Sequence, residues 1–294
     1  MAIAVSTLLT RLAYRLGEDN TPGDTNENAR RISYLSEAQR KVMGESYWWF
    51  ANDIGSFAVV AGQENYSLEA DFRDMIELRV DRDVCLPISA PELYSSYDYP
   101  PISVTPEGFT NSYFVFGDNE LHLLPRPSTT PSLMTVTSLT ATGGVASATI
   151  SAAHGLQVND YIIIVGANET DYNGTFRIVS VPTTTTLTYT ISGTPSSPAT
   201  GTITAQNANV VYRYWQQHTD FTATTSTTII PDRFSDILVA HALQRKLSGP
   251  LEDERGSMAD AIEEYNAILL DMKKENNRKK FYFKQFIPRE ANVL

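Results

Sequence analysis

The chain begins with two segments in which apolar residues recur every three or four positions. The first runs from about residue 5 and has a Gly at position 17, where a helix of that period is expected to end. The second covers about residues 25–43, with an acid in its first turn and bases in its last, a polarity that suits the helix dipole. Both patterns predict helices with one buried face. The first face comprises Val5, Leu8, Leu9, Leu12 and Leu16.

Four consecutive aromatic residues, YWWF at 47–50, follow the second predicted helix. Large aromatic side chains dominate ordinary cores, so we expect this run to plug the core at the helix end. The alternative is that one of the rings meets a neighbouring element or subunit.

From about residue 57 the apolar period changes to two, which is typical of strands. Residues 113–116 and 121–124 flank the turn sequence GDNE and predict a hairpin. Residues 209–215 alternate again, so we expect them to return to the same sheet. Residues 86–112 are rich in Pro, Ser and Tyr and are expected to form a long surface loop.

The composition shifts between Leu133 and Gln206, a stretch with 17 threonines, no lysine and four charged residues. Short β-branched runs alternate there with Gly, Asn and Pro, which favours a small sandwich or barrel. We therefore predict an all-β domain over residues 132–207, inserted into a body formed by 1–131 and 208–294. The last third of that body is expected to be a helix pair, one opening at Pro231 and one near Ser257. The fold class is α+β: a helix-bundle body with a small antiparallel sheet and an inserted all-β domain.

The net charge of −11 argues against a protein that reads DNA sequence, because such proteins need a basic footprint. It is compatible with a wall along which DNA slides. The single cysteine, Cys85, excludes an intramolecular disulfide and fits assembly in a reducing cytosol. The apolar N-terminal stretch is interrupted by Arg11 and Arg15, so a signal peptide is not expected. No membrane span is expected either, since no run approaches roughly 18 to 20 apolar residues.

The chain offers little that resembles a catalytic constellation, and we expect no enzyme activity, cofactor or metal. Its histidines are scattered without metal-ligand spacing, and it has no phosphate-binding glycine loop. The candidates for a glycosidase-like carboxylate pair are Glu69, Asp71 and Asp74, although a solvated loop is the favoured interpretation. His154 is interpreted as a turn histidine that packs a hairpin of the inserted domain, with ligand binding as the alternative.

The C-terminal segment has the opposite charge sign to the rest of the chain. From residue 273 onward there are seven basic residues and two acids, with aromatic residues between them and Pro288 to block a helix. Such a surface is expected to dock, either on the chain's own sheet or on a partner subunit, with buried aromatics as anchors and bases at the rim. The candidate partner-binding residues of this extended tail are Arg278, Lys279, Lys280, Phe281, Tyr282, Phe283, Lys284, Phe286, Ile287 and Arg289.

The order of these parts resembles the adaptor, or head-to-tail connector, proteins of tailed bacteriophages. The resemblance rests on YWWF at 47–50, GQENYSL at 62–68, DFRDMI at 71–76, LHLLPRP at 121–127, VVYRYW at 210–215 and Ile-Pro at 230–231. The insert separately resembles small β-modules of phage virion proteins, through AHGL at 153–156, Gly166-Ala167, YNGTF at 172–176 and GTP at 193–195.

The resemblance implies a structural protein of the virion neck, assembled in the host cytoplasm. It implies a closed ring of about twelve copies beneath the portal protein, with the C-terminal tail docked on the portal. The ring would extend the DNA channel, let genomic DNA pass without sequence-specific binding, and offer a platform to a downstream tail or nozzle protein. The alternative function is a surface- or glycan-binding module that acts through the insert, for which Tyr161, Tyr172, Phe176 and Tyr189 are the aromatic candidates.

Overall fold

The computed structural model describes residues 3–17, 25–88, 107–247 and 255–285. Among these, it describes the side chains of all but residues 25, 255–257 and 280–285. The chain divides into two compact units. One, the helical unit, comprises residues 1–52 and 215–294, and the other, the β unit, comprises residues 53–214. The strands of the sheet thus fall in the same unit as the insert, and apart from the helices.

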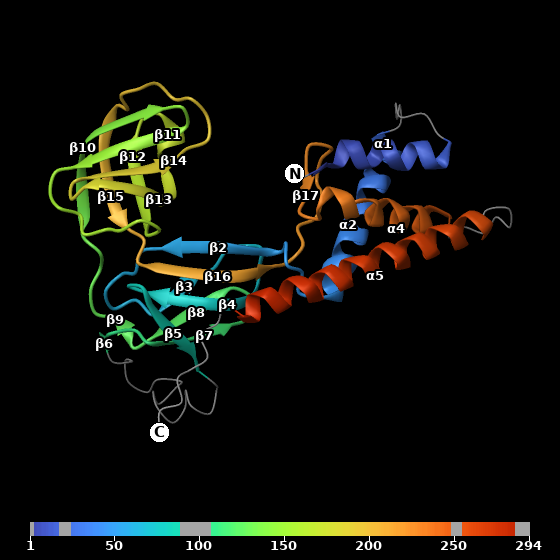
Figure 1. Cartoon of the computed structure of the whole chain (residues 1–294), viewed down its shortest axis with the longest axis horizontal. Coiled ribbons are helices and arrows are strands. Elements are labelled where there is room, and N and C mark those ends of the chain that lie inside the picture. Colours follow the sequence, from blue (N-terminus) through green and yellow to red (C-terminus); the bar gives the residue numbers. More distant parts are fainter. Residues whose placement is uncertain (1–2, 18–24, 89–106, 248–254, 286–294) are drawn as a thin grey trace. The chain divides into compact units, whose positions relative to one another are not determined.

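In the described part of the helical unit, helices from both ends of the chain share one core; Figure 1 shows these helices together. They are α1 (Val5–Leu16), α2 (Thr25–Glu45), α4 (Asp236–Leu247) and α5 (Arg255–Gln285), with a short 3-10 turn, η2 (Asp232–Phe234), before α4. A two-stranded pairing of β1 (Ile3–Ala4) with β17 (Thr227–Thr228) adjoins α1. The expected end of the first helix is confirmed, because Gly17 adopts a left-handed φ of 65° and closes the last turn.

The aromatic run after α2 contributes one core residue and three peripheral ones. Trp48 is fully buried, and its Nε1 donates a hydrogen bond to the Val42 carbonyl at 2.7 Å. Trp49 and Phe50 are partly buried against the same core, while Tyr47 is 39% exposed and lies 5.6 Å from the Trp215 ring. The core-plug interpretation therefore fits Trp48.

His241 is a buried polar residue at the contact of α4 with α5. It is 4% exposed, and its ring lies 5.7 Å from that of Tyr265. Burial lowers the pKa of His241, with Lys41 and Arg245 adding to the effect and Glu37 opposing it. The imidazole is therefore accommodated in its neutral form.

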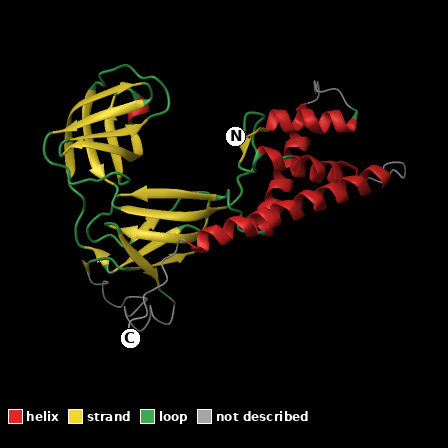
Figure 2. Cartoon of the chain, in the orientation of Figure 1, coloured by secondary structure: helices red, strands yellow, loops and turns green. Residues whose placement is uncertain are grey.

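The β unit contains a curled seven-stranded sheet in the order β2-β16-β4-β5-β7-β8-β3 (Figure 2). Its strands are β2 (Asn52–Phe57), β3 (Asn65–Ser67), β4 (Phe72–Val80), β5 (Asp83–Pro87), β7 (Ser112–Phe116), β8 (Glu120–Leu124) and β16 (Val210–Gln216). The predicted hairpin is confirmed as β7 and β8, and β16 returns to the sheet as expected. A second, two-stranded pairing joins β6 (Glu107–Gly108) to β9 (Arg126–Pro127).

The expectation of a purely antiparallel sheet was wrong. β5 and β7 pair in parallel, with Leu86 opposite Ser112. A parallel return needs a long connection rather than a tight turn, and the chain between these strands is long enough to provide one. Most of the predicted surface loop, residues 89–106, lies outside the described residues.

The threonine-rich segment folds into a closed barrel in the order β10-β11-β14-β13-β12-β15. The strands are β10 (Leu133–Thr142), β11 (Val145–Ile150), β12 (Tyr161–Ala167), β13 (Gly174–Thr183), β14 (Thr186–Thr190) and β15 (Gly201–Asn207). Inward positions alternate with outward ones, as in β11, where Ala146, Ala148 and Ile150 are buried. Of the two architectures that the sequence left open, sandwich or barrel, the barrel is the one present.

The sheet has its own core, in which one close approach fixes a glycine. Gly55 in β2 lies under the ring of Tyr212 in β16, so a Cβ at position 55 would overlap Tyr212. Tyr212 is 2% exposed, and burial raises the pKa of its hydroxyl to about 12. Cys85, on β5, is buried in the same core, where burial raises the pKa of its thiol to about 11.

Candidate partner-binding site at the end of α5

The predicted tail begins as part of α5 rather than as an extended segment. The helix continues to Gln285, so residues 278–285 are helical, whereas Phe286, Ile287 and Arg289 lie outside the described residues. The physical reason is that no Gly or Pro occurs between Met258 and Pro288, so the sequence offers nothing to break the helix earlier. The side chains of Lys280, Phe281, Tyr282, Phe283 and Lys284 are not described.

Arg278 and Lys279 are the two tail residues whose side chains the structure places. The Arg278 side chain is 67% exposed, with its guanidinium 3.8 Å from Glu275 one turn earlier. Lys279 is partly exposed. Neither is buried against the helical unit, so both are available at the surface of this chain.

Asn276 marks the point where α5 makes its last buried contact among the described residues. It is 2% exposed. Its Nδ2 donates to the Tyr47 carbonyl at 2.9 Å and to Ser46 Oγ at 3.1 Å, and its Oδ1 accepts from the Trp49 amide at 3.0 Å. A buried side-chain amide with both ends paired is costly to disrupt, so Asn276 anchors α5 to the turn after α2.

Charged contacts surround this anchor. Lys273 Nζ donates to Glu45 at 2.8 Å, which ties α5 to the end of α2. Arg233 forms an ion pair with Glu275 and lies 4.8 Å from the Phe234 ring centroid, in cation–π range. The Glu275 side chain is only 12% exposed, so it is enclosed between Arg233 and the first tail arginine.

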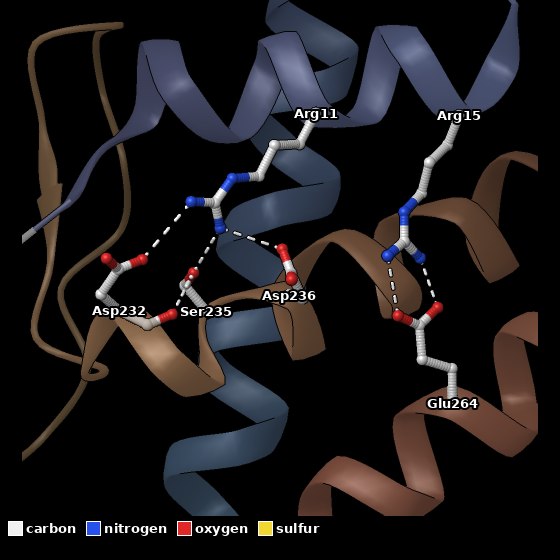
Figure 3. A network of polar contacts seen from close by, with 6 residues as sticks. All are labelled: Arg11, Arg15, Asp232, Ser235, Asp236 and Glu264. Carbon is white, nitrogen blue, oxygen red and sulfur yellow. Dashed lines mark hydrogen bonds and ion pairs between the residues drawn. The ribbon is translucent and has the colours of Figure 1, made fainter.

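Two arginines of α1 make a further set of polar contacts in the helical unit (Figure 3). Arg11 donates to Ser235 Oγ at 2.8 Å and to Asp236 Oδ1 at 2.9 Å. Arg15 forms a two-point ion pair with Glu264 of α5, and the hydrogen bonds raise the pKa of Arg15. Because Arg11 and Arg15 lie one turn apart, a single face of α1 holds both α4 and α5.

These contacts give α5 a fixed direction within the helical unit. It is attached near its start through Glu264 and again at Asn276, with buried apolar residues between these points. Up to Asn276, α5 is therefore fixed to the rest of the helical unit at two points along its length.

Two of the other candidates named from the sequence, Asp71 and His154, make local hydrogen bonds. Asp71 accepts a hydrogen bond from the Tyr214 hydroxyl at 2.9 Å, which together with burial raises the pKa of Tyr214. Among the described residues, no group of three or more His, Cys, Asp or Glu side chains is arranged to hold a metal ion. His154 is used locally, because its Nδ1 accepts a hydrogen bond from the Leu156 amide at 3.0 Å.

The aromatic candidates of the insert are mainly part of the barrel core. Tyr172 and Tyr189 are fully buried, and Phe176 stacks on Tyr189 at 4.4 Å. Tyr161 and Phe176 are both partly exposed, and Phe176 packs against the barrel core.

Sequence reasoning missed Asn276 and the two arginines of α1. Asn276 lies within a polar run, so nothing in its neighbours marks it as buried. The arginines did carry a signal, since they interrupt an apolar helix at one-turn spacing and face acids near Pro231 and in the last helix. Arg11 and Arg15 instead entered the argument only as evidence against a signal peptide.

Comparison with known proteins supports part of the resemblance drawn from the sequence. No curated protein matches the chain. One solved structure with similarity is "Phage phi92 endosialidase", at 15% identity and a TM-score of 0.23, a match that covers 57% of this chain and 31% of that one. At that score it carries no argument about fold or activity, so the resemblance of the insert to virion β-modules stays a prediction. No helix in the described part of the chain is both long and apolar enough to span a membrane.

The family comparison concerns the N-terminal half. Residues 3–138 match the family described as "SU10 adaptor protein". The match includes α1, α2 and the sheet strands through β8, and it ends inside the first barrel strand. It covers slightly less than half of the 294 residues and does not include α4 or α5. Over this part the chain is similar to phage adaptor proteins, and the similarity supports a structural role as a phage adaptor.

Proposed function

We propose that this chain is a structural adaptor of the phage virion neck. Copies form a closed ring of about twelve subunits beneath the portal protein, extend the channel for genomic DNA and present a platform to a downstream tail or nozzle protein. In this proposal the helices and the sheet, residues 1–131 and 208–294, act together as the adaptor body. The barrel, residues 132–207, is an accessory, and assembly takes place in the host cytoplasm.

The observation that supports the proposal is that α5 is anchored by Asn276 immediately before the basic, aromatic sequence begins. α5 is fixed at Asn276 and then continues through Gln285 into a basic, aromatic sequence. Aromatic anchors rimmed by bases are the composition of binding hot spots in protein interfaces. A chain with net charge −11 has no need of such a cluster for solubility, which favours a partner with a complementary acidic rim.

The charge balance also supports passage of DNA without capture. Affinity for the phosphate backbone requires lysines and arginines, and acids exceed bases by eleven over the whole chain. A channel wall with this balance lets DNA slide, because it forms few phosphate contacts that must be broken.

Truncation tests the tail assignment. A variant that ends at Asn277 loses the tail but keeps Asn276, and with it every buried residue that the described part of α5 contains. We expect its thermal unfolding to match the full chain and its binding to the cognate portal to be lost, as measured by co-sedimentation and native mass. Portal binding at full strength by this variant would show that the tail is not the docking element.

A charge-reversal pair separates the tail from the rest of α5. Lys279→Glu lies beyond the anchor, whereas Lys274→Glu lies before it, on an exposed position whose side chain is 65% accessible. Weaker portal binding is expected for Lys279→Glu alone. Equal loss in both variants would instead indicate that general positive charge along α5, and not the tail, drives association.

A further inference from the structure

The barrel and the sheet of the β unit keep separate cores. The buried cluster of the barrel and that of the sheet have no residue in common. The chain crosses between them through residues 128–132 and, on its return, through Ala208 and Asn209 alone. Where the two meet there is a hollow of about 810 Å³, lined by polar and apolar residues of both parts. Among the residues that the structure describes, no shared apolar core fixes the orientation of the barrel on the sheet.

The turn between β4 and β5 contains an unusual pair of residues. Asp81 and Arg82 both have positive φ, at 50° and 75°. This left-handed region is costly for side chains with a Cβ, and Asn-Gly is the common solution in such two-residue turns. An arginine in this conformation indicates that its side chain has a use that outweighs the local strain.

The Arg82 side chain reaches across to the barrel. Its Nε donates to Asp160 Oδ1 at 3.0 Å, and its second nitrogen pairs with Asp160 Oδ2 and approaches the Gly155 carbonyl at 3.4 Å. Two-point pairing of guanidinium with carboxylate fixes direction as well as distance. The strained position and the two-point contact thus occur at the same residue.

Asp160 is itself held in place, so it can act as a fixed receptor. Its side chain is 15% exposed and accepts the Gln157 amide at 2.7 Å. Its own carbonyl accepts the Ile178 amide at 2.8 Å, which ties the loop to β13. The carboxylate therefore moves with the barrel as a whole.

The other residue of the turn holds the chain where it returns from the barrel. The Asp81 amide donates to the Asn209 carbonyl at 2.9 Å, and Asp81 Oδ1 accepts from Asn209 Nδ2 at 3.1 Å. Asn209 Oδ1 in turn accepts the Val59 amide at 3.0 Å. One turn thus contacts both the barrel loop and the returning connection.

We propose that the β4–β5 turn is a polar latch that sets the orientation of the barrel. In the closed state Arg82 is paired with Asp160, and the barrel and the sheet move as one body. In the open state this ion pair is broken, and the barrel reorients about its two connections while both cores stay folded. The Arg82 side chain is 52% exposed, so the latch responds to ionic strength and to competing charged groups.

Distance measurement between the two parts tests the latch. Spin labels are placed on Asp118→Cys in the β7–β8 turn and Thr142→Cys at the end of β10, both exposed positions. The native Cys85 is buried with a pKa raised to about 11, so it does not compete for the label near neutral pH. The parent chain is expected to give a single narrow distance peak by pulsed electron resonance.

Each of the variants Arg82→Gly and Asp160→Asn is expected to replace that single narrow peak by a broad distance distribution. The double variant is expected to give a distribution no broader than that of either single variant. Arg82→Gly also relieves the left-handed strain, so its folding is not at risk. Arg177→Gln is the matched control, because Arg177 contacts Asn159 within the barrel. High salt is expected to broaden the parent and leave Arg82→Gly unchanged. A peak in Arg82→Gly as narrow as in the parent would overturn the latch.

Discussion

Replacing Asn276 by alanine tests whether a single buried amide anchors α5. The change removes the hydrogen bonds that Asn276 makes with the Trp49 amide and the Tyr47 carbonyl, at 3.0 and 2.9 Å. The loss of each hydrogen bond at such a partly buried site costs about 1–3 kcal/mol. Alanine returns about 0.5 kcal/mol through its higher helix propensity. We therefore expect the free energy of unfolding of the helical unit to fall by about 2–4 kcal/mol, allowing for partial access of water to these groups.

The neighbouring residue provides a matched control. Asn277 is exposed and lies in the same helix, so Asn277→Ala gains the same helix propensity without losing a buried contact. All three tryptophans, at positions 48, 49 and 215, lie in the helical unit, so their fluorescence during urea unfolding reports on that unit. Amide hydrogen exchange at Trp49 gives a second, local measurement.

A difference of less than about 1 kcal/mol between the two alanine variants, a spread typical of surface substitutions, would refute the anchor. Faster exchange at Trp49 in Asn276→Ala, with no change in Asn277→Ala, is the local signature of the lost anchor. Unchanged exchange in both would mean that the other contacts of α5 hold it without the Asn276 amide.

Three further outcomes follow from buried groups. Gly55→Ala is expected to destabilise the sheet by about 2 kcal/mol or more, because the added Cβ would overlap Tyr212 and force a shift. Gly44→Ala in α2, where the added Cβ meets open space, is expected to stabilise the helix by about 0.5–1 kcal/mol. Urea unfolding measures the free energy of unfolding of both variants. Burial lowers the pKa of His241 in the folded state, so its contribution to stability is present above the ordinary pKa of 6.5 and is lost as pH falls below it. Melting temperatures between pH 8 and pH 5 should therefore fall less in His241→Phe than in the parent; parallel curves would contradict this. Cys85, with its pKa raised to about 11, should react with a thiol reagent at pH 7 only after unfolding, and rapid labelling of the native chain would show the thiol to be accessible.

The sequence predicted best those elements whose signal is local. A few adjacent residues determine the end of α1 at Gly17 and the β7–β8 hairpin. The strands of the barrel are indicated by the alternation of apolar and polar residues along each of them. Closure of the barrel is not local. It depends on β10 pairing with both β11 and β15, the second of which is more than sixty residues away. Alternation alone cannot separate that arrangement from a sandwich.

Long-range polar pairs were the main omission. The bond from Asn276 to Tyr47 joins residues 229 positions apart, and Arg15 to Glu264 spans 249. Hydrophobic periodicity locates buried faces, but it is silent about which polar group will satisfy a particular backbone amide. The parallel pairing of β5 with β7 was missed for a related reason, since it depends on a connection whose path the sequence does not specify.

The barrel starts and ends at points of the chain that lie side by side, and this bears on how the coding sequence can be altered. Its first and last strands pair with one another, Leu133 lying opposite Gln206. Partner Cα atoms in an antiparallel pair are about 5 Å apart. The chain therefore enters and leaves the barrel at two neighbouring points. A DNA segment coding for this stretch can be deleted, or exchanged for another with neighbouring ends, and the flanking strands need only a short turn to rejoin. The closeness of Leu133 to Gln206 thus makes residues 133–206 a segment whose removal would leave a gap that a short turn can close.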